Sequence, residues 1–233
     1  MKKVFALMVC FSVMCGAAWG EVEINATNFP DGTFRYYVRQ RDTDGDSVLS
    51  DAEIANTTEL GIFVPIVEYG SISSMQGIEY FTALTSLNCG GNELTTLDVS
   101  HNTALTELWC DRNQLTALDV SHNVALTRLN CGENPLTALD LSNNPALTML
   151  ECYSNDIATI NISNNTALTW LDVNNNTALT SLNCSGKQLA YLDVSGCTAL
   201  GVLQCNSNDL MELDVSSNTA LTYLNCSNNQ LMV

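Results

Sequence analysis

The sequence predicts a solenoid of stacked repeats, mostly β, in which short parallel strands follow one another along the coil behind a small α-helical cap. Three features predict this fold: a period of 21 residues, an alternation of apolar and polar side chains within each period, and a different composition before the repeats begin. Such a period indicates units that bury their apolar faces only by stacking on their neighbours.

The period is visible as tandem segments of similar sequence. The first full unit, Leu84 to Ala104, reads LTSLNCGGNELTTLDVSHNTA and consists of two halves, LxxLxC and LxxLDV. The units begin 21 residues apart, with one short step between the fifth and sixth, at Leu84, Leu105, Leu126, Leu147, Leu168, Leu179, Leu200 and Leu221. Eight tandem starts make a chance pattern negligible.

Each half predicts a strand with one buried face. Leu87 and Cys89 alternate with Ser86, Asn88 and Gly90, which is the two-residue period of a strand. Stacking places these strands about 4.8 Å apart, so leucine and cysteine columns form a continuous core. Two columns of asparagine are expected to satisfy backbone groups of neighbouring turns. The first column holds Asn92, Asn113, Asn134, Asn155, Asn208 and Asn229, and the second holds Asn102, Asn123, Asn144, Asn165, Asn176 and Asn218.

Both halves match the L-x-x-L-x-L-x-x-N/C pattern, so residues 84–233 resemble a leucine-rich-repeat array. The nested 21-residue form is similar to the short bacterial class called IRREKO, and the layout is similar to exported, internalin-like bacterial proteins. Residues 63–83 are expected to be a transitional repeat that joins the cap to the array. Their core residues are predicted to be Ile72, Met75, Ile78 and Phe81.

The array is irregular near residues 168–188. Leu168 to Ala178 is an LxxLDV half that directly follows another, and Lys187 stands where the first asparagine column should continue. We interpret this as a bend or a simple deletion. The sequence stops at Val233 within a half-repeat, and an uncovered last strand is a site for pairing. We expect a monomer, and an end-to-end dimer that pairs through this strand is the alternative.

Residues 1–20 predict a signal peptide. Lys2 and Lys3 precede an apolar run from Val4 to Met14, and small residues then allow cleavage before Glu21. The alternative is an uncleaved anchor, but the run is too short for a membrane span. We therefore expect a secreted or cell-surface protein without membrane insertion.

The charge restricts the class of partner. The formal net charge of −17 becomes −19 when Lys2 and Lys3 leave with the signal peptide. Nucleic acid and anionic membranes would be repelled, whereas cations or a basic partner would be attracted.

Cysteine usage indicates core residues. Seven of the ten cysteines share one register of the repeat, whose equivalent in the sister half holds Val99, Val120 and Leu141. Because a buried thiol behaves as a small apolar side chain, we predict unpaired core thiols. The alternative is disulfides between adjacent turns.

Residues 21–62 are predicted to form a helix–loop–helix cap. A helix is expected over Thr33 to Gln40, with Asp31 near its start, and a second helix is expected from Ile54. The intervening DTDGDSVLSDAE resembles a single EF-hand, which implies one structural calcium ion bound by Asp42, Asp44, Asp46, the Val48 carbonyl, Ser50 and Glu53. Ser47 stands at loop position 6, where glycine is usual, and strain there should weaken binding. A metal-free cap is the alternative.

The outward columns of the two halves differ. In the LxxLDV half they hardly change, with one file of aspartates, interrupted by Asn161, at Asp98, Asp119, Asp140, Asp172, Asp193 and Asp214. Their mutual repulsion should raise their pKa values unless hydroxyls, backbone donors or cations compensate. Cation binding along this file is therefore a hypothesis.

In the LxxLxC half the outward residues vary and include aromatic side chains. We predict that this half presents a binding face for a protein or glycan ligand, because Trp, Tyr and Arg dominate interface energies. The face would continue onto Val202 and Tyr223, and Trp170 of the irregular LxxLDV half would join it. Its predicted residues are Glu107, Trp109, Asp111, Arg128, Met149, Glu151, Tyr153 and Trp170. The alternative is repeat drift with incidental aromatic residues.

The sequence does not predict an enzyme. His101 and His122 occupy the same freely varied slot of two repeats, and no Ser-His-Asp set, phosphate loop or zinc spacing occurs. A non-catalytic binding protein is the favoured function, with adhesion or host interaction implied by the family resemblance. A structural or self-associating envelope component is the alternative.

Overall fold

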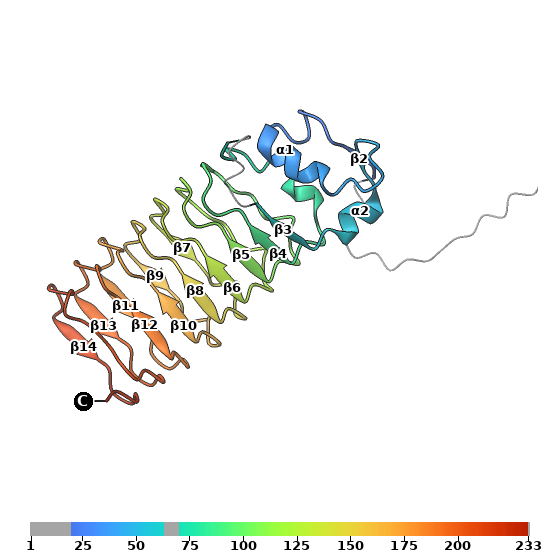
Figure 1. Cartoon of the computed structure of the whole chain (residues 1–233). Helices are drawn as coiled ribbons and strands as arrows, with labels where there is room; N and C mark the ends of the chain where they lie inside the picture. The colour runs from blue at the N-terminus through green and yellow to red at the C-terminus, as the bar shows by residue number, and fades with distance from the viewer. Residues whose placement is uncertain (1–19, 63–69, 233) are drawn as a thin grey trace, which may run out of the picture.

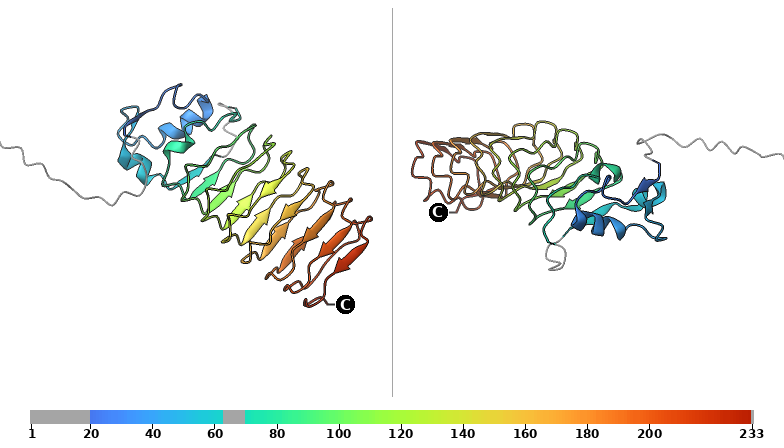
Figure 2. Two further views of the ribbon diagram at one scale, coloured as in Figure 1. Left: turned by 180° about the vertical axis from the view of Figure 1, so that it is seen from behind. Right: turned by 90° about the horizontal axis from the view of Figure 1, so that it is seen from above.

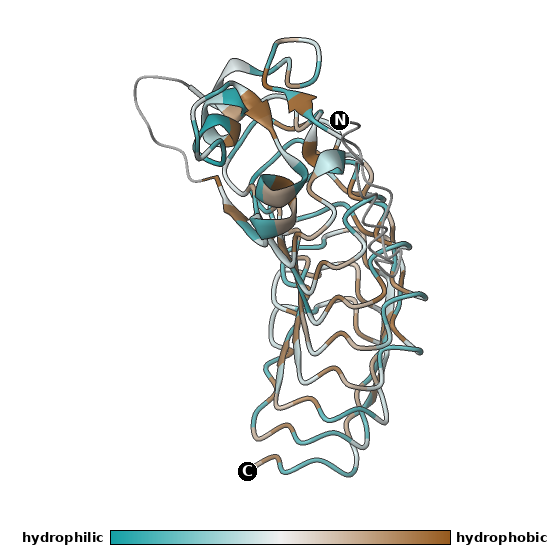
Figure 3. Ribbon diagram, turned by 90° about the vertical axis from the view of Figure 1, so that its right-hand side faces the viewer, coloured by the Kyte–Doolittle hydropathy of each residue, from teal (hydrophilic) through white to brown (hydrophobic). Residues whose placement is uncertain are grey.

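The computed structural model describes residues 20–62 and 70–232, which form an elongated solenoid with a cap at its N-terminal end (Figure 1, Figure 2). The predicted signal peptide lies outside the described residues except for Gly20, as does the start of the predicted transitional repeat, residues 63–69. Apolar and polar segments alternate along each turn of the coil (Figure 3). In the described ranges, no helix has the length and apolar character needed to cross a bilayer.

One wall of the solenoid is a parallel sheet, here called the first sheet. Its order is the order of the chain, with a step of 21 residues between paired strands from β4 onward. The first strand comes from residues predicted to belong to the cap, so the sheet begins earlier than expected. The strands are β3 (Glu59–Gly61), β4 (Ser86–Asn88), β5 (Glu107–Trp109), β6 (Arg128–Asn130), β8 (Met149–Glu151), β10 (Trp170–Asp172) and β12 (Tyr191–Asp193).

The opposite wall, here called the second wall, is also parallel but less continuous. It begins with an isolated bridge between Asp98 and Asp119, and a second bridge joins Thr159 to Ser181. Its strands are β7 (Leu139–Asp140), β9 (Ile160–Asn161), β11 (Ser181–Asn183), β13 (Val202–Gln204) and β14 (Tyr223–Asn225). The two walls face each other across the core.

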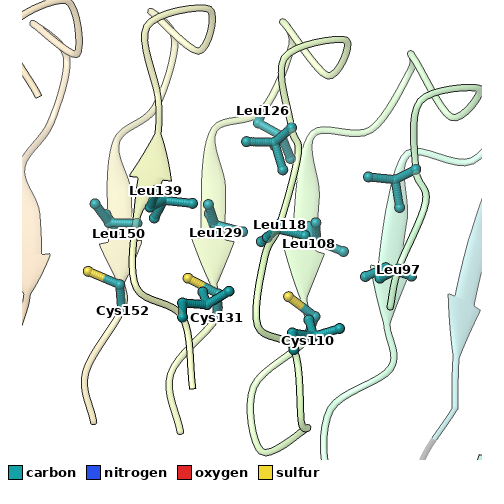
Figure 4. Close-up of a cluster of buried hydrophobic side chains, with 14 of the residues drawn as sticks. Leu97, Leu108, Cys110, Leu118, Leu126, Leu129, Cys131, Leu139, Leu150 and Cys152 are labelled. Carbon is teal, nitrogen blue, oxygen red and sulfur yellow. The ribbon is translucent and has the colours of Figure 1, made fainter. Parts of the chain in front are cut away.

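Leucine and cysteine columns fill the space between the walls. Figure 4 shows the thiols of Cys110, Cys131 and Cys152 in line from one turn to the next, with Leu118 and Leu139 of the second wall opposite. All eight described cysteines are free, so the prediction of unpaired core thiols is confirmed. Burial raises the pKa of the Cys131 thiol to about 12, which keeps it protonated and unreactive.

The asparagine columns are structural, as predicted. The amide of Asn123 donates to the carbonyls of Val99 and Asn102 in the preceding turn, at 3.0 and 2.9 Å. Each first-column asparagine also accepts a backbone N–H from the preceding turn. A threonine ladder was not anticipated from the sequence: Thr106 Oγ1 donates to the Thr85 carbonyl at 3.0 Å, and the contact recurs in neighbouring turns. Together these bonds satisfy the backbone where the coil changes direction.

The first sheet continues without a break through the irregular half-repeat. Trp170 pairs with Met149 on one side and Tyr191 on the other, so the extra LxxLDV half occupies the first sheet. From this point the two kinds of half exchange walls. The prediction that Val202 and Tyr223 continue the binding face is therefore wrong, because both lie on the second wall.

The exchange also divides the predicted aspartate file. Asp98, Asp119 and Asp140 lie on the second wall, whereas Asp172 and Asp193 pair with each other on the first sheet. Lys187 takes an asparagine position at the exchange, and its buried Nζ donates to the Asn165 carbonyl at 3.3 Å.

The cap contains two short helices around the acidic loop. Helix α1 (Gly32–Arg39) starts where Asp31 accepts the amides of Thr33 and Phe34, as its sequence suggested. Helix α2 (Asp51–Asn56) begins three residues before the predicted Ile54, because Ser50 and Glu53 form a capping box.

Strand β1 (Val22–Glu23) pairs antiparallel with β2 (Val48–Leu49) at the end of the acidic loop. The predicted core residues Ile72, Met75, Ile78 and Phe81 are buried, and the 3-10 helix η1 (Ile78–Tyr80) lies among them. Phe29 of the cap packs edge-on against Tyr80. The cap and the array therefore share one core.

Candidate functional site

The outward side chains of the first sheet form two parallel files, here called the first-sheet face. Strand register places six of the eight residues predicted from the sequence in these files. One file runs Glu107, Arg128, Met149, Trp170 and then Tyr191, and the other runs Trp109, Asn130, Glu151, Asp172 and Asp193. Asp111 and Tyr153 follow strands β5 and β8.

Ion pairs neutralise the N-terminal part of this face. Arg128 Nη1 lies 3.3 Å from Glu107 Oε1 in the adjacent strand, and Arg112 Nε lies 2.9 Å from Glu133 Oε1 at the edge of the sheet. These side chains are largely exposed, so the pairs add little to stability. They offset the charges of Glu107 and Glu133.

Tyr153 and Asp111 do not project as predicted. A Cβ atom on Gly132 would lie 2.5 Å from the Tyr153 ring, so this ring lies over the glycine of the preceding turn. In the same way the Asp111 carboxylate lies over Gly90. Burial raises the pKa of both Tyr153 and Asp111. Both residues are thus half-covered parts of the face, and the glycines make room for them.

The C-terminal part of the face carries an aromatic stack. The rings of Trp170 and Tyr191 are parallel within 14° and their centroids lie 4.0 Å apart. Trp170 is 39% exposed. Register alone brings the two rings together, because their residues are directly paired on adjacent strands.

Beside this stack lies a file of acidic residues. The pKa of Glu151 is raised by burial and by Asp172, and the pKa of Asp172 is raised by burial and by Asp193. Asn174 Nδ2 donates to Asp172 Oδ1 at 2.8 Å, which offsets part of this repulsion. The predicted repulsion between stacked carboxylates therefore contributes to the raised pKa values in this file.

On the second wall, hydrogen-bond donors compensate the repulsion between the aspartates. The side chain and backbone of Ser100 lower the pKa of Asp98, and the equivalent serines do the same for Asp119 and Asp140. Asp214, which is not part of this wall and lies one repeat period after Asp193 of the first sheet, also has its pKa lowered by Ser216. Hydroxyl and backbone donors compensate these charges, so cation binding gains no support from this file.

The acidic loop of the cap assembles three of its six predicted calcium ligands. Carboxylate oxygens of Asp42, Asp44 and Asp46 lie within 4.8 Å of one another. Asp42 accepts the amides of Gly45 at 2.7 Å and of Ser47 at 2.9 Å. Ser47 has φ 69°, the left-handed conformation that the sequence predicted to be strained.

The other predicted ligands have different contacts. Glu53 Oε2 accepts the Ser50 amide and hydroxyl at 2.9 Å, and its Oε1 accepts the Thr43 hydroxyl at 2.7 Å. These bonds, led by that of the Ser50 amide, lower the pKa of Glu53 to about 2. Val48 lies in β2. Three carboxylates and a nearby ionised fourth suit a hard cation, although Glu53 would have to turn from Thr43 to reach it.

Solved structures of other proteins share the fold of this chain. No protein-family model and no curated protein matches the sequence. Among solved structures, the functional domain of InlJ from Listeria monocytogenes is 40% identical with a TM-score of 0.61, over 92% of this chain and 49% of that one. The chain thus spans about half the length of that domain. Internalin C2 from the same organism is 19% identical with a TM-score of 0.59, over 94% and 93%.

The chain is a leucine-rich-repeat protein of internalin-like layout. The structure named above for InlJ is described as including a cysteine ladder. In this internalin-like solenoid, Cys89, Cys110, Cys131 and Cys152 form such a column at 21-residue spacing. The column lies in the core and supplies no reactive group to either wall.

The sequence analysis missed part of the candidate site. Tyr191 and, one turn later, Glu212 and Asp214 belong to LxxLDV halves, whereas apart from Trp170 the binding face was predicted on the LxxLxC half. The sequence did contain a signal for this arrangement. Successive halves alternate between the walls, so two LxxLDV halves in a row move every later half to the other wall. Counting halves instead of aligning similar ones would have placed Tyr191 beside Trp170, and Glu212 and Asp214 one turn further along the same wall.

Proposed function

We propose that this internalin-like protein is a secreted or cell-surface, non-catalytic binding protein whose first-sheet face takes a protein ligand. The observation that supports this most directly is the Trp170–Tyr191 stack on an open sheet face, in register with Met149 and Arg128. Large aromatic side chains and arginine contribute most to binding energy at protein interfaces.

Solenoids offer such surfaces because stacking produces a long, rigid wall whose outward residues vary without disturbing the core. The first-sheet face has this character, since its outward residues change from turn to turn while the residues beneath them stay apolar: leucine in one column, and cysteine followed by Val173 and Val194 in the other. Rigid strands hold the aromatic rings in place before binding, which lowers the entropic cost of association.

A matched pair of variants tests the assignment. Trp109→Ala/Trp170→Ala removes two aromatic side chains from the first-sheet face. Tyr223→Ala removes an aromatic side chain that is 50% exposed on the second wall. Purified protein would be applied to immobilised extracellular-matrix proteins, glycans and whole cells. The proposal expects binding to a protein target that the first variant loses and the second retains.

Other outcomes would point elsewhere. Equal binding by both variants would contradict the assignment of the face, and aromatic-dependent binding only to glycans would replace the protein ligand by a glycan. Concentration-dependent assembly without any ligand binding, seen by sedimentation, would favour a self-associating envelope component instead.

We also propose that the acidic loop binds one calcium ion with a structural role in the cap. Asp42, Asp44 and Asp46 would supply the first ligands, and Glu53 would complete the site by leaving Thr43. Because extracellular modules bind calcium with Kd values of about 10⁻⁴–10⁻³ M, 10 mM calcium should stabilise the protein by about 1.4–2.7 kcal/mol.

Thermal unfolding with calcium and with chelator measures this effect. Asp44→Asn/Asp46→Asn should abolish the shift, whereas Asp98→Asn/Asp119→Asn removes the same charge from the second wall and should keep it. A Tm that is independent of calcium in the unaltered protein would support the metal-free cap.

A further inference from the structure

A groove of about 480 Å³ adjoins the aromatic stack on the first-sheet face. It lies between β12 and residues 212–214, which follow β12 by one repeat period. Tyr191 and Leu213 contribute apolar surface, and three carboxylates line the same groove, from Asp193, Glu212 and Asp214. No lysine or arginine is among its lining residues.

The surroundings of the groove supply no positive charge. Residues 129–233 contain nine aspartates and glutamates and a single lysine. That lysine, Lys187, is buried and donates to the Asn165 carbonyl. Both ion pairs found in the described part of the chain join residues before position 134. The carboxylates of this groove are thus not neutralised in the way that Arg128 and Arg112 neutralise the N-terminal part of the face.

The groove also has an ordered aromatic wall. Trp170 stacks on one face of the Tyr191 ring, which leaves Tyr191 beside the carboxylates and restricts its motion. An aromatic face attracts a cation within about 6 Å of its centre. Asp193 Oδ1 and Asp214 Oδ1 accept the amides of Ser195 and Ser216 at 2.8 Å, so both carboxylates are held in position.

We propose that this groove takes a lysine or arginine side chain, and that the protein ligand of the first-sheet face presents a basic segment there. This rests on the proposed function, because it assigns the chemistry of that ligand. The aliphatic part of the side chain lies along Leu213 and Tyr191, as long cationic side chains commonly do on apolar surface. The cationic end reaches Asp193, Glu212 and Asp214 and forms charge-assisted hydrogen bonds.

Labelled peptides test the proposal directly. The probe is a fluorescein-labelled decapeptide with four lysines separated by glycine and serine, and the same peptide with glutamates is its control. Fluorescence anisotropy at 50 and 200 mM NaCl gives the affinity and its salt dependence. Binding of the lysine peptide and none of the glutamate peptide is expected.

Two double variants separate the groove from general attraction to an acidic protein. Asp193→Asn/Asp214→Asn removes two charges from the groove, and Asp98→Asn/Asp119→Asn removes two from the second wall. All four aspartates accept a serine amide two residues later, and asparagine keeps that acceptor. We expect the groove variant to bind the lysine peptide about tenfold more weakly, and the control to change by less than about twofold. Glu212→Gln, at an exposed position, provides a second groove variant that leaves both serine contacts intact.

Equal weakening by the two double variants would overturn the proposal, because the attraction would then come from net charge alone. Absence of lysine-peptide binding to the unaltered protein would overturn it as well. If Trp109→Ala/Trp170→Ala loses a protein target while the groove variants behave like the control, only this inference fails. If the groove variants lose the peptide selectively but the aromatic variant keeps its target, the proposed function fails and the groove remains.

Discussion

Replacing Asn134 by alanine should destabilise the solenoid more than any single contact suggests. Its Nδ2 donates at 3.1 Å to the carbonyls of Cys110, Cys131 and Gly132, and its Oδ1 accepts the Leu115 amide at 3.0 Å. All four contacts are buried. A hydrogen bond contributes about 1 kcal/mol net, and a buried group left without a partner costs about 1–3 kcal/mol. We therefore expect Asn134→Ala to lower the free energy of unfolding by about 4 kcal/mol.

Urea unfolding followed by far-UV circular dichroism measures this loss, with Asn143→Ala as the matched control. Asn143 is exposed in the same repeat, and its replacement should change stability by less than about 0.5 kcal/mol. Hydrogen exchange at the Leu115 amide gives a local readout, because that amide loses its acceptor only in the Asn134 variant. A loss below about 1 kcal/mol with the Leu115 amide still protected would refute this account of the ladder.

Two further predictions concern buried polar chemistry. Cys131→Ser places a hydroxyl without an established partner at a fully buried position and should lower the urea midpoint, whereas Cys131→Val should be tolerated because valine fills the equivalent place in the sister half. Burial lowers the pKa of Lys187, so the penalty for its charge is full below the folded pKa and fades as pH rises through it. Stability measured by urea midpoint should therefore rise at alkaline pH, and Lys187→Met should remove that rise.

Much of the fold follows from local pattern. The alternation around Leu87 and Cys89 defines a strand with one buried face, and the repeat period then requires parallel stacking. The helix start at Asp31 is equally local, because its carboxylate accepts the amides of residues two and three positions later. These features depend on residues close in sequence, so the sequence alone reveals them.

The site was harder to predict because it depends on neighbouring turns. Tyr153 lies flat because Gly132, 21 residues earlier, has no side chain to hold it away. Glu53 faces Thr43 and Ser50 because hydrogen-bond donors there satisfy its carboxylate within the loop. The aromatic stack required knowing that Trp170 and Tyr191 fall on one wall, which depends on the number of half-repeats between them.

That dependence on counting leads to a last prediction. Because the two kinds of half occupy either wall equally well, deleting the extra half, residues 168–178, should restore strict alternation without unfolding the coil. Ser181, now on the second wall, would then pair with Met149 on the first sheet, and Tyr191 would move to the second wall. Paired residues of adjacent strands lie about 4.8 Å apart, within the Cα range of a disulfide.

Met149→Cys/Ser181→Cys should therefore cross-link on oxidation in the deletion variant and not in the full chain, as read by mass spectrometry. In the full chain, Met149→Cys/Trp170→Cys is the positive control, since these residues are paired there. The native thiols of both walls are mostly buried and should not compete. If the control forms its bridge but the deletion variant folds without the new one, the identity of each half, and not its place in the count, selects the wall.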